Sequence, residues 1–185
     1  MGTIKVVVLV GSLRKASINL RLAKAVERLA PQDFVFEHAR LDDLPLYDQD
    51  FDADYPAAAK RLKQQIEAAD ALLFVTPEYN RGVPGVLKNA IDLASRPWGT
   101  NSFAGKPGVV IGASIGATGS ALAQQHLRNS LVFLDVATLA QPEVFVQFKD
   151  DGPVDSGGQI ANGDTRKFLQ AFMDRYAAWI RKNLR

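Results

Sequence analysis

Two loops of the chain carry residue types suited to binding a phosphate group and a flat heterocycle. The first loop, residues 11–19, contains hydroxyls, an amide and a guanidinium, and it directly follows the apolar run 4–10. The second loop, residues 76–85, contains a tyrosine among prolines and glycines, and it directly follows the apolar run 71–75. Short apolar runs rich in β-branched residues are typical of strands buried on both faces. The sequence therefore places each polar loop at the end of a buried strand.

The first loop is predicted to bind a phosphate at the start of a helix. A helix N-terminus presents unpaired N–H groups and a partial positive charge, which favour an anion. Ser12, Ser17 and Asn19 add neutral donors. The guanidinium of Arg14 can form a bidentate pair with a phosphate. The simpler alternative is that Ser17 only caps the helix and that Arg14 is a solvated side chain.

The second loop is predicted to be a rigid turn against which a flat ring can lie. Its rigidity comes from two prolines and two glycines, Pro77, Gly82, Pro84 and Gly85. A rigid wall reduces the entropy that is lost when a ligand binds. We therefore expect that replacing Gly85 with valine distorts the loop.

Within this turn, Glu78, Tyr79 and Asn80 offer the contacts for a ring. Backbone N–H groups near these residues can bond the pyrimidine edge of a flavin and stabilise negative charge near its N1 atom. Tyr79 can pack on the ring or the phosphate, and Asn80 can hold the loop or touch the ligand. In the alternative, Tyr79 covers the sheet edge and Glu78 caps the following helix. Together the two loops predict a mononucleotide site, with flavin as the best candidate.

A third loop, residues 112–119, follows another apolar run and contains Gly-Ala-Ser-Ile-Gly. This pattern matches the nucleophile elbow of serine hydrolases, in which Ser114 would be the nucleophile. Such enzymes need an acid and then a histidine after the serine, whereas His126 precedes the candidate acids and belongs to the next expected helix. His38 precedes the serine altogether. We therefore favour a binding role for Ser114 over hydrolysis or a simple glycine turn.

The rest of the pattern alternates strands with amphipathic helices. This alternation favours a parallel sheet with right-handed crossovers and helices on both faces. Five strands in a single domain, residues 1–185, indicate a flavodoxin-like three-layer α/β/α sandwich with a five-stranded parallel sheet of order 2-1-3-4-5. The expected strands are 4–10, 34–41, 71–75, 107–113 and 136–139, the last extended by 144–148, and the expected helices run near 22–30, 57–69, 83–96, 121–134 and 168–180. We expect an irregular acidic connection at 42–54 and a mobile surface loop at 149–164.

Composition and charge narrow the class of protein further. The 185 residues include no cysteine, which excludes disulfides and thiolate sites, and two distant histidines argue against a metal site. The first strand is followed by the single Gly11 and not by the G-x-G-x-x-G fingerprint, so we do not expect a nicotinamide cofactor bound in a Rossmann cradle. The formal charge is +2 with mixed signs, which gives no basis for nucleic-acid binding. We see neither a secretory signal nor an apolar run near the roughly 20 residues that span a bilayer, so we expect a cytoplasmic protein without a membrane partner.

The motifs GSLRKASIN at 11–19, PEYN at 77–80 and PGVLKNAID at 84–92 resemble those of the NADPH-dependent FMN reductase family. The most similar branch is that of the bacterial chromate and quinone reductases. The resemblance implies tightly held FMN, NADPH or NADH as co-substrate, and homodimers that can pair into homotetramers. By this resemblance the cofactor-binding residues are Ser12, Arg14, Ser17, Asn19, Pro77, Glu78, Tyr79, Asn80 and Ser114. Gly82 stands where the family favours serine, which leaves the substrate preference open.

The expected activity is that of an FMN-dependent NAD(P)H oxidoreductase that reduces quinones, chromate or similar small acceptors. The expected mechanism is ping-pong: NAD(P)H delivers a hydride to the flavin and leaves, and the acceptor then enters the same crevice. The flavin carries the chemistry while the protein supplies position and field, so no side chain is named as catalytic. The main alternative is a flavodoxin-type electron carrier, which would bind FMN without oxidising NAD(P)H rapidly.

Overall fold

The apolar runs of the sequence lie side by side as strands of one parallel sheet in the computed structural model, which describes residues 2–184. The order across the sheet is β2-β1-β3-β4-β5, and a further strand, β6, also pairs with β4. The strands are β1 (Ile4–Val10), β2 (Phe34–His38), β3 (Ala71–Thr76), β4 (Pro107–Ser114), β5 (Ala137–Thr138) and β6 (Phe145–Gln147). The predicted strand order is confirmed.

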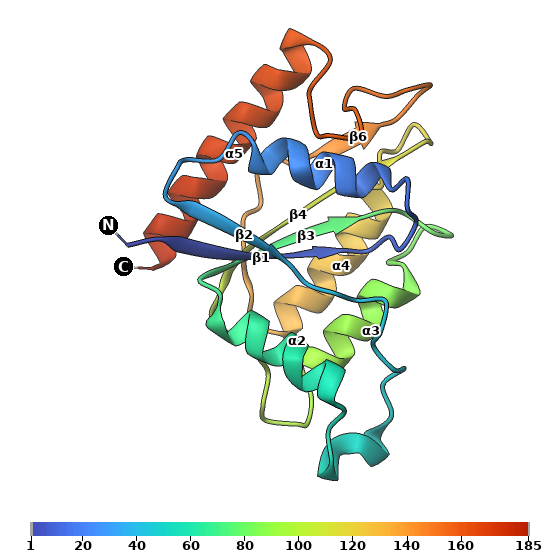
Figure 1. The fold of residues 1–185 in the computed structure, drawn as a ribbon, viewed down its shortest axis with the longest axis vertical. Helices are drawn as coiled ribbons and strands as arrows, with labels where there is room; N and C mark the ends of the chain where they lie inside the picture. Colours follow the sequence, from blue (N-terminus) through green and yellow to red (C-terminus); the bar gives the residue numbers. More distant parts are fainter. Residues whose placement is uncertain (1, 185) are drawn as a thin grey trace.

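Helices cover both faces of this sheet. Figure 1 shows α1 and α5 on one face, and α2, α3 and α4 on the other. The helices are α1 (Ile18–Glu27), the short 3-10 helix η1 (Gln49–Ala53), α2 (Ala57–Ala68), α3 (Gly85–Ala94), α4 (Ala121–Phe133) and α5 (Gly163–Asn183). Among the helices between residues 2 and 184, none has the length together with the hydropathy that a bilayer crossing requires. The fold is the expected flavodoxin-like three-layer sandwich.

The central strands are apolar throughout because both of their faces are buried. Along β1, Val6 and Val8 pack toward α1 and α5, whereas Val7 and Leu9 pack toward α2, α3 and α4. All four side chains are at most 2% exposed. Successive strand residues point to opposite faces, so alternate residues of one strand supply the two halves of the core.

The fifth position of the sheet differs from the prediction, because two short strands occupy it in place of one. β5 pairs with Pro107 and Gly108 at the start of β4, whereas β6 pairs with Gly112 to Ser114 at its end. Between the two strands the chain passes through Pro142, which has no N–H to donate to a sheet. The segment 144–148 therefore resumes the edge of the sheet after an interruption.

The segment around the start of α5 contains more regular structure than the sequence pattern indicated. α5 begins at Gly163, ahead of the expected residue 168, because the side chain of Asn162 caps it by accepting from Thr165 N. The loop before it was expected to lie on the surface, yet Val154 is fully buried and forms an isolated bridge with Ile160. Part of this loop is thus anchored in the core beside α1.

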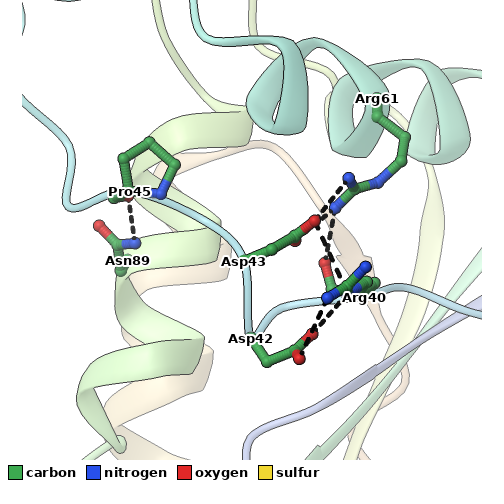
Figure 2. Close-up of polar contacts among 6 residues, drawn as sticks. All are labelled: Arg40, Asp42, Asp43, Pro45, Arg61 and Asn89. Carbon is green, nitrogen blue, oxygen red and sulfur yellow. Dashed lines mark hydrogen bonds and ion pairs between the residues drawn. The ribbon is translucent and has the colours of Figure 1, made fainter.

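Ion pairs hold the acidic connection after β2 against α2 (Figure 2). The guanidinium of Arg61 donates to both carboxylate oxygens of Asp43, at 2.9 and 2.7 Å, and to the backbone oxygen of Arg40 at 3.2 Å. Arg40 itself pairs with Asp42 at 2.8 Å. The hydrogen bond from Arg61 lowers the pKa of Asp43 below its ordinary value, so the carboxylate stays charged at a more acidic pH than an unpaired aspartate does.

The other side of this connection is held by Asn89 of α3. Its Nδ2 donates to the backbone oxygen of Pro45 at 2.8 Å (Figure 2). Its Oδ1 accepts from Tyr47 N at 2.8 Å. β2 ends at His38, earlier than the predicted residue 41, and the chain then passes between these contacts into η1. The segment 42–54, expected to be irregular, is therefore fixed at both α2 and α3.

We predict different outcomes for alanine at two glycines of the candidate loops. A Cβ at Gly11 would lie 2.9 Å from Cγ of Pro84 and 3.1 Å from Cδ2 of Leu87, because the end of β1 packs on the start of α3. A Cβ at Gly85 would meet no atom within 4 Å. Gly11→Ala is therefore expected to lower the free energy of unfolding by about 1–3 kcal/mol, whereas Gly85→Ala is expected not to destabilise the protein.

Chemical denaturation of the two variants beside the wild type measures this difference. Equal stability of the Gly11 and Gly85 variants would contradict the packing at the end of β1. The free space at Gly85 is that of a single Cβ, so the expectation that the larger valine distorts the second loop stays a prediction.

Candidate functional site

The three polar loops meet at one edge of the sheet. They follow β1, β3 and β4, which are neighbours in the strand order, so their carboxyl ends lie together. Val10 is paired with Val75, and Thr76 is paired with Gly112, so the strands end at nearly the same level. A pocket of about 290 Å³ lies at this edge. Its lining consists of Ser12, Arg14, Ser17, Ile18, Asn19, Pro77, Glu78, Tyr79, Ala113, Ser114 and Ile115.

Eight of the nine predicted site residues line this pocket, and Asn80 is the ninth. Sequence reasoning missed Ile18, Ala113 and Ile115, which are apolar neighbours of predicted residues and carry no chemical signal of their own. Their position next to Ser17, Asn19 or Ser114 was the available hint. A larger hollow of about 590 Å³ lies between α3 and α4, away from the strand ends.

The first loop places its donors at the start of α1. The hydroxyl of Ser17 accepts from Leu20 N at 3.1 Å, so this residue is the N-cap that the simpler alternative described. Its own proton remains available to a ligand in the pocket that it lines. Within residues 2–184, Arg14 has no ion-pair partner, so its guanidinium is free to bind an anion. Ser12 and Arg14 therefore remain the predicted phosphate contacts.

Asn19 has a structural task that the sequence did not reveal. Its side chain is 1% exposed and exchanges two hydrogen bonds with Ala113 of β4. Nδ2 donates to Ala113 O at 3.0 Å, and Oδ1 accepts from Ala113 N at 2.9 Å. The amide thereby fixes the start of α1 to the end of β4. One amide proton remains for a ligand, since the NH2 group carries two.

The second loop turns back through a tight hairpin. Tyr79 N donates to Gly82 O at 3.2 Å, and Gly82 N donates to Tyr79 O at 3.0 Å. Asn80 and Arg81 have φ angles of 52° and 61°, which is the pattern of a type I′ turn. Asn80 is therefore at the tip of the hairpin, outside the pocket lining, whereas Pro77 is buried beneath the pocket and Tyr79 is 55% exposed beside it.

The carboxylate of Glu78 caps a helix, but not the helix that follows it in sequence. Oε2 accepts from Leu122 N at 3.0 Å and from Ala123 N at 3.2 Å, both in the first turn of α4. The second loop is thus fastened to the helix that follows the third loop. Only the folded structure brings these two segments together, so no local sequence pattern predicts this contact.

The third loop offers no catalytic base to its serine. The hydroxyl of Ser114 accepts from Gly116 N at 3.1 Å. His38 pairs with Glu27 at 2.6 Å, and among residues 2–184 neither histidine bonds to Ser114. The serine-hydrolase alternative therefore lacks the arrangement that its mechanism requires.

Gly82, where the family resemblance favours serine, lies beside α4. A Cβ at this position would be 3.5 Å from Nδ1 of His126, which is an ordinary van der Waals distance. The Cβ of a serine therefore has room here, and the glycine leaves this position without a hydroxyl beside the histidine.

The residues of the pocket fit FMN. Arg14 and the N–H groups at the start of α1 supply donors of the kind that a phosphate needs. Pro77 and Tyr79 line the same pocket and offer ring surfaces of the kind that a flat heterocycle packs against. The carboxylate of Glu78 is already bonded to backbone N–H groups of α4, so it is not a free negative charge in the pocket.

Known proteins resemble this chain along nearly its full length. The sequence model of the NADPH-dependent FMN reductase family matches residues 4–151. A 2-hydroxy-1,4-benzoquinone reductase from a Burkholderia species is 54% identical over 178 residues, covering 96% of this chain and 97% of that protein. An NAD(P)H-dependent FMN reductase from Pseudomonas aeruginosa is 43% identical over 180 residues, covering 97% of this chain and 96% of that protein.

A solved structure agrees with these relatives. FerB, a flavoenzyme NAD(P)H:(acceptor) oxidoreductase from Paracoccus denitrificans, matches with a TM-score of 0.93 and 44% identity, covering 98% of this chain and 99% of that one. The family match also includes every residue that lines the pocket. The chain belongs to the NADPH-dependent FMN reductase family.

Proposed function

We propose that this protein is an FMN-dependent NAD(P)H oxidoreductase that passes electrons to a small acceptor such as a quinone. The observation that carries the proposal is the pocket at the ends of β1, β3 and β4, which joins anion donors to a flat wall. FMN, when bound, accepts a hydride from the nicotinamide and passes electrons to the acceptor. Because the hydride donor is an intracellular nucleotide, the proposal keeps the expected cytoplasmic location.

Two groups of residues are assigned to the cofactor in this proposal. Ser12, Arg14 and Ser17 bind the phosphate through their side chains, helped by the N–H groups at the start of α1. Pro77 and Tyr79 flank the ring. The remaining predicted residues are Asn19, Glu78, Asn80 and Ser114, and all but Asn80 line the pocket. In the proposal, each of them holds its loop in place or contacts the cofactor through its backbone.

We also propose that the two substrates use the pocket in turn, as a ping-pong mechanism requires. Tyr79 and Ile115 line the pocket and are 55% and 77% exposed, so an aromatic and an aliphatic side chain remain open at its rim. Such a rim suits the flat ring of a nicotinamide and then of a quinone. Arg14 and Arg81 add positive charge to the same region, which keeps chromate among the proposed acceptors.

The protein is further proposed to form a homodimer or homotetramer through the hollow between α3 and α4. Val132 and Phe133 form an apolar ridge beside it and are 71% and 68% exposed. Trp98, which follows shortly after the end of α3, is 77% exposed. The same hollow is bordered by the ion pair of Lys88 and Asp92, at 2.8 Å. A two-fold interface must be complementary to itself, and a surface with a hollow, an apolar ridge and both signs of charge meets that condition.

The activity is tested by anaerobic spectroscopy on purified protein reconstituted with FMN. We expect that NADPH or NADH bleaches the yellow absorbance of the bound flavin within seconds and that a benzoquinone then restores it. A protein that binds FMN but stays yellow with both nucleotides would be an electron carrier. A protein that takes up no FMN would refute the proposed function.

The phosphate contact is tested with Arg14→Ala. Losing the charged hydrogen bonds of this guanidinium is expected to weaken FMN binding by about 2 kcal/mol, or roughly thirtyfold. Arg166→Ala is a matched control, because this arginine is exposed on α5 and lies outside the pocket lining. Fluorescence titration of apoprotein with FMN gives both affinities. An Arg14 variant that binds FMN as tightly as the control does would remove the phosphate role.

The interface is tested with Phe133→Asp, which places a charge on the apolar ridge. We expect its mass by analytical ultracentrifugation to fall below that of the wild type, because burying an unpaired carboxylate opposes association. Leu46→Asp is the control, since Leu46 is 80% exposed in the connection after β2 and is expected to leave the mass unchanged. A monomeric wild type, or equal masses for all three proteins, would contradict the proposed interface.

A further inference from the structure

The helix α4 begins without a cap of its own. The residue before it, Ser120, has a left-handed backbone with φ of 70°, and its side chain makes no capping hydrogen bond. No acidic residue lies in the first turn of the helix. The first N–H groups of a helix are unpaired and carry partial positive charge, so this helix start requires an anion or an acceptor from elsewhere.

Glu78 supplies that acceptor from the loop after β3. Its Oε2 accepts from Leu122 N and Ala123 N, at 3.0 and 3.2 Å, and Thr118 Oγ1 makes a longer contact of 3.5 Å with Oε1. Leu122 and Ala123 are 44 and 45 positions after Glu78 in the sequence. A single carboxylate therefore joins the second loop, the third loop and the start of α4.

The same residue also lines the candidate cofactor pocket, between Pro77 and Tyr79. Its position therefore determines two properties of that pocket. The backbone on either side of Glu78 is held at a fixed distance from α4, and the negative charge of the carboxylate offsets the positive end of the helix beside the pocket.

We propose that Glu78 is a positioning residue that fixes the second loop on α4 and tunes the reduction potential of the bound FMN. This inference rests on the proposed function. FMN gains negative charge near N1 on reduction, and an uncompensated helix start would stabilise that charge. The carboxylate of Glu78 cancels this effect and so keeps the potential low enough for electrons to pass onward to the acceptor.

Two substitutions separate the effect of the charge of Glu78 from the effect of its side-chain length. Glu78→Gln keeps an oxygen that can accept from Leu122 N and Ala123 N but removes the charge. Glu78→Asp keeps the charge, but its side chain is one methylene shorter, so we expect it to lose at least one of the two hydrogen bonds. Glu143→Gln is the control, because Glu143 bonds the side chain of Gln125 on the same helix at 2.6 Å and lies outside the pocket lining.

The measurements are the FMN dissociation constant, by fluorescence titration of apoprotein, and the midpoint potential against a reference dye. We expect E78Q to retain FMN and to have a more positive midpoint potential than the wild type. We expect E78D to bind FMN roughly tenfold more weakly, the loss of about one charge-assisted hydrogen bond, with a potential close to that of the wild type. E143Q is expected to match the wild type in both measurements.

A purely structural cap would not move the potential, so this readout distinguishes the two roles. An unshifted potential in E78Q, or an unchanged FMN affinity in E78D, overturns the inference; if E78Q does not fold, the affinity of E78D decides alone. Wild-type protein that takes up no FMN refutes the proposed function instead. The two failures are therefore distinguishable in one set of titrations.

Discussion

The parallel register of β1, β3 and β4 is the constraint on which the candidate site depends. Because the three strands run in one direction, their carboxyl ends lie at one edge, and the loops that follow must share that edge. Gly11, where the first loop begins, packs closely against Pro84 of the second loop, so these two loops are in contact. Burial of apolar strands thus determines where polar loop residues meet.

Polar contacts that are buried at Asn19 and partly buried at Glu78 then hold the three loops in a fixed relation. Asn19 joins the first loop to the third through Ala113, and Glu78 joins the second loop to α4. Both side chains satisfy backbone groups that would otherwise be unpaired, and an unpaired buried N–H costs about 1–3 kcal/mol. Residue types that suit ligand binding are therefore used here to connect backbone segments, which leaves the chemistry to the cofactor.

The two charged side chains that line the pocket differ in whether they are already paired. The carboxylate of Glu78 faces a helix start, whereas within residues 2–184 the guanidinium of Arg14 has no carboxylate partner. The negative group is thus compensated and the positive group is available, so the field around Arg14 favours an anion. Elsewhere, as between Arg61 and Asp43, opposite charges pair and fix a connection in place.

The sequence by itself determined the strand order, the position of the three loops and eight of the residues that line the pocket, because buried strands and loop motifs are local patterns. Only the tertiary structure decided that the last strand divides around Pro142, that Asn80 sits at the tip of a hairpin, and that Glu78 caps α4. These features depend on partners far away in the chain, such as Leu122. A hydrogen bond across 44 residues leaves no periodicity or spacing to recognise, since it exists only once the layers have packed.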